Sequence, residues 1–147
     1  MSSSYLSAEV RRLVADRAEQ LCEYCLIHRD DTFLGCSIDH IISIKHGGSS
    51  RDENLAYACT ICNSNKGSDI SSLVPGTGEL VRLFNPRIDR WRDHFRLDQA
   101  VIIPLTEIGE ATVRILGFNQ DDPLLERETL QAIGRYPGPA ARSRILS

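Results

Sequence analysis

The 147-residue chain has only two lysines and one tryptophan, and no apolar run approaches the ~20 residues that a membrane span requires. Residues 1–5 contain neither a basic region nor an apolar stretch, so the sequence predicts no signal peptide, a cytoplasmic location and no membrane partner. Glycine and proline are not in excess and no internal repeat occurs, which excludes collagen-like and low-complexity proteins. The net charge of −3 excludes a globally basic nucleic-acid binder but not a local basic patch.

Four of the five cysteines form two Cys-x2-Cys pairs, Cys22/Cys25 and Cys59/Cys62, and Cys36 is left over. Disulfides are not expected in a reducing compartment, and two such pairs match a tetrahedral four-thiolate site. The sequence therefore predicts structural Zn²⁺ on these four sulfurs, with a redox motif as the alternative. The pairs are 33 residues apart, which is longer than a simple zinc ribbon, so a sizeable unit lies between them. Cys36 is expected to be a buried small residue on a strand, with a role as an alternative zinc ligand less favoured.

The first half of the chain reads as a helix, two strands and a second helix. Ser7 is placed to cap a helix over 8–18, whose apolar residues follow the helical period. Residues 33–42 are predicted to be extended and 56–58 to form a brief strand before the second cysteine pair. A helix is predicted over 60–68.

A Pro- and Gly-rich stretch after residue 73 predicts a boundary between a core, 1–73, and an α+β extension packed on it, 74–147. In the extension the sequence predicts strands over 79–84, 100–104 and 112–118, a helix over 124–133 and a loose tail from residue 134. The predicted fold class is therefore α+β.

A second set of polar residues lies between and just after the cysteine pairs. Zinc binding would fold the segment with Asp39 and His40 back against the helix with Asn63. A carboxylate and an amide oxygen are hard ligands that suit Mg²⁺ or Mn²⁺, and a neutral imidazole can accept a proton from water. Lys66, one helical turn beyond Asn63, is predicted to reach a phosphate. Asn54 alone would be read as a turn residue.

Together these residues resemble the HNH endonucleases, whose ββα-metal fold places two strands and a helix around one divalent ion. The pattern is Cys22-x2-Cys25, Asp39-His40-Ile41, Gly47-Gly48, Asn54-Leu55 and Cys59-x2-Cys62-Asn63-x2-Lys66, within about residues 20–68. The resemblance implies an H–N–N variant of the zinc-containing branch, in which Asn63 takes a place that is histidine in some relatives.

The resemblance also implies a role for each matched residue. His40 would be the general base, and Asp39 and Asn63 would hold the catalytic ion. Asn54 would fasten the loop between strand and helix and orient His40 through backbone hydrogen bonds. Neighbours on a regular strand point to opposite faces, so Asp39 and His40 can share one site only if the strand ends or bulges there.

The segment from Arg87 to Arg96 interleaves arginines with Trp91 and Phe95. One interpretation is a nucleic-acid surface, with Arg90 and Arg92 on phosphates and the aromatic rings stacked on bases. The other places both rings in the core and leaves the arginines on a solvated face.

These observations favour a metal-dependent HNH-type endonuclease that hydrolyses DNA. The first alternative is a zinc-stabilised module that binds nucleic acid without cutting it, and the second is a zinc-stabilised protein–protein adaptor. The chain has no large recognition domain, which indicates low intrinsic specificity or a protein partner that supplies it.

Overall fold

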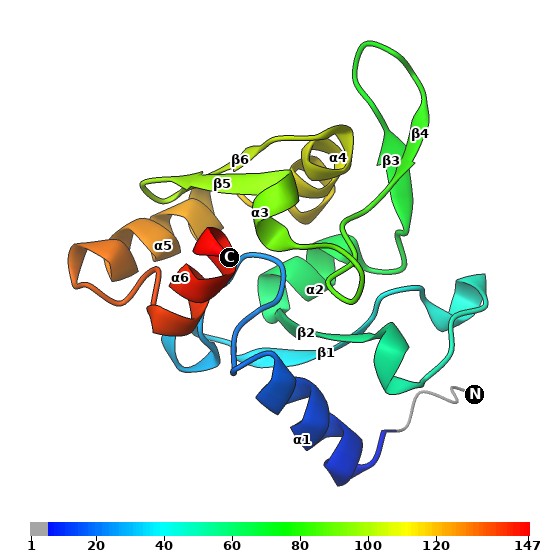
Figure 1. Ribbon diagram of the computed structural model, residues 1–147, viewed down its shortest axis with the longest axis horizontal. Coiled ribbons are helices and arrows are strands. Elements are labelled where there is room, and N and C mark those ends of the chain that lie inside the picture. Colours follow the sequence, from blue (N-terminus) through cyan, green and yellow to red (C-terminus); the bar gives the residue numbers. More distant parts are fainter. Residues whose placement is uncertain (1–5) are drawn as a thin grey trace.

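The computed structural model describes residues 6–147 as a mixture of helices and three small sheets, so the fold class is α+β as predicted (Figure 1). The helices are α1 (Ala8–Arg17), α2 (Thr60–Lys66), α3 (Trp91–His94), α4 (Glu107–Leu116), α5 (Asp121–Ala132) and α6 (Pro139–Leu146). The strands are β1 (Cys36–His40), β2 (Leu55–Cys59), β3 (Ser71–Leu73), β4 (Leu80–Arg82), β5 (Phe95–Asp98) and β6 (Val101–Pro104). Three single-turn 3₁₀ helices are η1 (Arg29–Asp31), η2 (Ile44–His46) and η3 (Asp52–Asn54).

The antiparallel pair β1–β2 lies between two helices (Figure 1). Ile38 pairs with Tyr57 and His40 with Leu55. Ile38, Tyr57 and Leu55 belong to the cluster on which α1 packs. The alternate residues face α2, which follows β2 directly and contacts β1 through side-chain hydrogen bonds. The pair thus has a mostly apolar face toward α1 and a polar face toward α2.

The first helix forms where the sequence predicts it. The Ser7 hydroxyl accepts a hydrogen bond from the Val10 N–H at 3.2 Å, which satisfies one of the free donors of the first turn. Val14 and Ala18 on the inner face are fully buried against Leu55 and Tyr57. The outer face stays polar, so arginines of α1 reach the surface.

The main core joins both halves of the chain. Phe95 is at its centre, with ring centroids 5.1 Å from Trp91, 5.3 Å from Phe84 and 5.7 Å from Phe118. The indole N–H of Trp91 donates to the Tyr24 carbonyl at 2.8 Å. The rings of the Arg-rich segment are therefore core residues and do not stack on bases. One continuous cluster runs across the predicted boundary, and the division at residue 73 stays a prediction.

Residues 112–118 were predicted to be a strand, which is wrong: they belong mainly to α4. Thr106 caps this helix by accepting from the Gly109 N–H at 3.0 Å. Ala111, Thr112 and Leu116 are buried at helical spacing. Tertiary packing of that face overrides the β-branched composition that favoured a strand.

The predicted loose tail is also wrong, because it is ordered into α6 and packed on the core. Pro139 lies in the first turn of the helix, where a missing N–H is tolerated. Ala141 is fully buried, and the buried Tyr136 hydroxyl donates to the Cys25 carbonyl at 2.7 Å. These contacts fix the end of the chain against the first cysteine pair.

Within residues 6–147, no helix combines the length and the apolar character that crossing a bilayer requires. The predicted absence of a signal peptide concerns residues 1–5, which lie outside the described residues.

Candidate functional site

Four buried cysteine sulfurs form one cluster. The Sγ atoms of Cys22, Cys25, Cys59 and Cys62 all lie within 4.8 Å of one another, and those of Cys25 and Cys59 are 3.8 Å apart. A tetrahedron with Zn–S bonds of ~2.3 Å has edges of about 3.8 Å. No disulfide joins any of the cysteines. The cluster therefore has the donor set and the spacing of a structural zinc site.

Backbone N–H groups support the same assignment in both pairs. The Cys25 N–H points at the Cys22 sulfur at 3.5 Å, and the Cys62 N–H points at the Cys59 sulfur at 3.4 Å. Such donors stabilise charge on a thiolate, which is the form that binds metal. Cys36 lies outside the cluster, and burial raises the pKa of its thiol well above the ordinary value.

A buried cation beside the sulfurs lacks a carboxylate partner within residues 6–147. Arg127 is 1 % exposed and donates to the Ala100 carbonyl and the Asn119 side chain, but its Nη1 has no hydrogen-bond partner among the described residues. Arg127 lines the same small hollow as Cys25, Cys59 and Cys62. Four thiolates on one Zn²⁺ carry a net charge of −2, which would balance a guanidinium that is otherwise costly to bury. The residues present therefore fit zinc.

A separate hollow of about 240 Å³ lies where β1 ends, and it is lined by Asp39, His40 and Asn63. Asp39 faces α2, and His40 is the last residue of the strand. Because the strand stops there, the two adjacent residues line one hollow in spite of the alternation along a strand. The sequence resemblance and the structure thus bring the same three residues together.

Asp39 is 3 % exposed and strongly held. Its carboxylate accepts a hydrogen bond from the Tyr24 hydroxyl at 2.7 Å and has the Lys66 Nζ at 3.1 and 3.2 Å from its two oxygens. Burial raises the pKa of this carboxyl, and Lys66 and Tyr24 oppose the change. These contacts leave part of the acceptor capacity of the carboxylate open toward a cation.

Asn63 lines the same hollow. Its Nδ2 donates to the Ser37 hydroxyl at 2.8 Å, which fixes the side chain against β1 and leaves the amide oxygen for another partner. An amide oxygen and a carboxylate oxygen suit Mg²⁺ or Mn²⁺, which usually keeps several waters as further ligands. The donor set at this hollow therefore fits a hard divalent cation.

His40 is half-buried, and its Nε2 lies 3.1 Å from the Ser50 hydroxyl. Ser50 is in the glycine-rich loop that follows η2. The contact restricts rotation of the ring and leaves Nδ1 for another partner. Sequence reasoning missed Ser50, because a serine in a polar loop gives no signal of its own.

Asn54 fastens the loop between β1 and β2. Its side chain accepts from the Ile42 N–H at 2.9 Å and donates to the Ile42 and Ser49 carbonyls at 2.9 and 2.7 Å. Its own backbone carbonyl accepts from the Ile41 N–H at 2.8 Å. These bonds start one residue after His40, so Asn54 determines how the chain leaves the strand.

Gly48 allows this closure, because a Cβ at that position would lie 1.7 Å from the Ile42 carbonyl oxygen. Only glycine fits there. The preceding Gly47 has φ +92° and ends η2 in the left-handed region. The two adjacent glycines are thus explained by geometry.

Lys66 is 1 % exposed, and the expectation that it reaches a phosphate is corrected. Its ammonium contacts the Asp39 carboxylate and donates to the His40 and Ile41 carbonyls, both at 3.0 Å. The Lys66 side chain points toward the end of β1 and not toward solvent. Lys66 therefore ties α2 to β1 directly beneath the hollow.

Arg90 and Arg92 lie on the surface, away from the hollow at the end of β1. Arg90 pairs with Asp93 at 3.3 Å, and Arg92 donates to the Leu146 carbonyl at 3.1 Å. Neither residue lines the hollow of His40. Their contact with nucleic acid stays a prediction.

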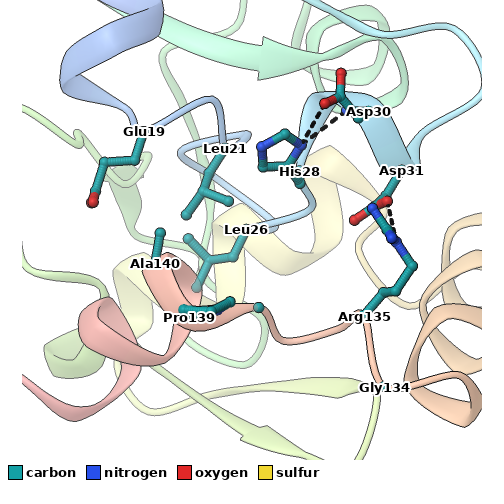
Figure 2. Close-up of a pocket in the computed structure, with 11 residues that line it drawn as sticks. Glu19, Leu21, Leu26, His28, Asp30, Asp31, Gly134, Arg135, Pro139 and Ala140 are labelled. Carbon is teal, nitrogen blue, oxygen red and sulfur yellow. Dashed lines mark hydrogen bonds and ion pairs between the residues drawn. The ribbon is translucent and has the colours of Figure 1, made fainter.

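A larger hollow, about 680 Å³, lies elsewhere, between η1 and the segment before α6 (Figure 2). It is lined by Glu19, Asp30 and Asp31, and Arg135 is paired with Asp31 at 2.7 Å. Figure 2 shows an apolar floor that includes Leu26. Carboxylates repel a phosphate, so size alone does not identify the nucleic-acid site.

The strand pair followed by a helix, braced by four cysteines, is the ββα unit that the sequence resemblance implies. Residues 22–69 match the family model described as HNH endonuclease, so this segment is similar to HNH domains. Among curated proteins and solved structures, none is significantly similar to the chain. The domain indicates a function on nucleic acids.

Proposed function

We propose that the protein is a metal-dependent HNH endonuclease that hydrolyses phosphodiester bonds in DNA. The observation that supports this most directly is the joint lining of one hollow by Asp39, His40 and Asn63. A module that only binds nucleic acid has no need for an imidazole beside two hard oxygen donors. Low sequence specificity, or a protein partner that supplies it, belongs to the same proposal.

In this proposal His40 is the general base that takes a proton from the attacking water, with Ser50 holding the ring. Asn54 positions His40 by fixing the residues that follow it. Asp39 and Asn63 would hold Mg²⁺ or Mn²⁺, which stabilises charge that develops on the phosphate and on the leaving oxygen. Lys66 and Tyr24 keep the Asp39 carboxylate oriented toward the hollow.

The test is nicking of a supercoiled plasmid, with Mn²⁺ or Mg²⁺ titrated into metal-depleted buffer. His40→Ala should lower the rate at least ~100-fold, because a general base contributes about 10²–10⁴-fold. His46→Ala is the matched control, since that histidine is exposed in η2 and does not line the hollow. Asn63→Ala should raise the metal concentration that gives half of the maximal rate.

Bound zinc must be measured in every sample, because a chelator that strips zinc would stop nicking by unfolding the core. Full activity of His40→Ala with normal zinc content would contradict the assignment. Wild-type protein that binds DNA without nicking it in any metal would support the non-cleaving alternative instead.

A further inference from the structure

A second hollow, about 300 Å³, lies between α1 and β1, and Arg29 of η1 and Tyr57 of β2 also line it. Ile38 lines both this hollow and the hollow of His40, and Ser37 of the second hollow accepts a hydrogen bond from Asn63 of the first. The two hollows therefore meet at β1, one on the side of α1 and the other on the side of α2.

Three arginines line this second hollow, which we call the arginine groove: Arg11 and Arg12 from α1, and Arg29 from η1. Asp16 is its one acidic lining residue. Arg11 and Arg12 are exposed, and within residues 6–147 Arg12 has no ion-pair partner. Arg29 is 3.5 Å from its neighbour Asp30, an exposed pair of small energetic value. The groove thus has positive charge that the protein itself does not neutralise.

We propose that the arginine groove binds the sugar–phosphate backbone of the DNA beside the scissile phosphate. This inference rests on the proposed function, because it takes the hollow of His40 as the point of cleavage. Guanidinium groups bind phosphate oxygens in a fork geometry and release condensed counterions. The larger hollow shown in Figure 2 is lined by three carboxylates, which makes it less suited to a polyanion.

The length of β1 limits how far the groove lies from His40. Cys36, at the groove, is four positions before His40, and a strand rises ~3.3 Å per residue, so the two residues are about 13 Å apart. The groove therefore reaches phosphates near the cleaved bond and not the bond itself. Contacts at that distance add affinity without touching the reacting atoms.

The inference is tested by fluorescence anisotropy of a labelled 30-base-pair duplex without catalytic metal, in a salt titration. We expect the double variant Arg12→Gln/Arg29→Gln to bind more weakly and to flatten the slope of log affinity against log salt by about one for each phosphate that the variant no longer neutralises. Arg12→Lys should keep most of the slope, since it keeps the charge. In nicking assays the double variant should raise KM and leave kcat unchanged.

Arg96→Gln and Arg142→Gln are the matched controls, because both residues are exposed and neither lines the groove. They should keep the wild-type slope. A double variant with the wild-type slope, or a wild-type protein without salt-dependent DNA binding, would overturn the proposal that the arginine groove binds DNA. Absence of nicking with intact, groove-dependent binding would instead overturn the proposed hydrolysis and leave the groove supported.

Discussion

The four-sulfur cluster and the hollow of His40 differ in almost every physical respect although they share two elements. The cluster is buried, and two of its sulfurs accept hydrogen bonds from backbone N–H groups. The hollow is open, and its oxygen and nitrogen atoms are only partly satisfied within the protein. Helix α2 serves both, because Cys59 caps it, Cys62 lies in its first turn and Asn63 follows. The comparison separates the residues that stabilise the fold from those available for chemistry.

Removal of the structural zinc should have the largest effect on stability, and it should disrupt both the four-sulfur cluster and the hollow of His40. Structural zinc contributes about 10–16 kcal/mol of apparent binding free energy in small zinc domains, which exceeds the stability of most domains. We expect Cys25→Ser or strong chelation to abolish cooperative unfolding as followed by circular dichroism, together with loss of zinc by elemental analysis.

Cys36→Ser is the control for this prediction, since Cys36 lies on β1 outside the cluster. It should keep its zinc and most of its stability. Retention of a cooperative transition by zinc-free protein would show that the sulfur cluster does not hold the core together.

Replacement of Lys66 should have the second-largest effect on stability. It tests whether the hollow of His40 has structural support that does not depend on the zinc. Lys66→Met leaves the buried Asp39 carboxylate without its cation, and breaking such a pair costs about 3–5 kcal/mol. Lys45→Met, at an exposed lysine, should change the free energy of unfolding little.

The double variant Lys66→Met/Asp39→Asn should recover part of the loss, because no uncompensated charge remains. Denaturant titration measures all three variants. Equal stability of Lys66→Met and wild type would mean that the ion pair beneath the hollow is dispensable.

Replacement of Arg127 should have the smallest effect of the three, and it should alter the four-sulfur cluster without altering the hollow of His40. Arg127→Met removes the proposed counter-charge of the zinc thiolates, and loss of such an outer partner typically costs about 10–100-fold in metal affinity. Competition with a chromogenic chelator measures this. Arg142→Met is the control, and unchanged zinc affinity of the Arg127 variant would refute the assignment.

The sequence predicted those parts of the site that depend on short-range spacing. Cys-x2-Cys positions two sulfurs through local geometry, Ser7 caps its own helix, and Asn63 follows Cys62 on the same turn. The family resemblance supplied Asp39 and His40, and the described hollow contains both. Local spacing therefore predicted most of the four-cysteine cluster, and the resemblance predicted the residues of the hollow.

Contacts that depend on packing could not be predicted in this way. Lys66 looks like any helical lysine, and only the position of α2 against the end of β1 makes it internal. Tyr24 lies inside the first cysteine pair, and nothing in that motif indicates that it bonds Asp39. The segment 112–118 has a β-branched composition, but its burial against the core favours a helix. The pattern of a single sequence does not show which residues become buried by contacts with distant parts of the chain.

The anchoring of the first cysteine pair from beyond residue 73 has a consequence for modularity. The Tyr24 and Cys25 carbonyls are neighbours, and they accept from Trp91 and Tyr136, which lie far along the chain. An excised segment 22–69 would expose both carbonyls and the apolar surface around them. Transplanting this segment into another protein would therefore require Trp91 and Tyr136 to be transferred with it, which makes the second half of the chain a scaffold and not an optional appendage.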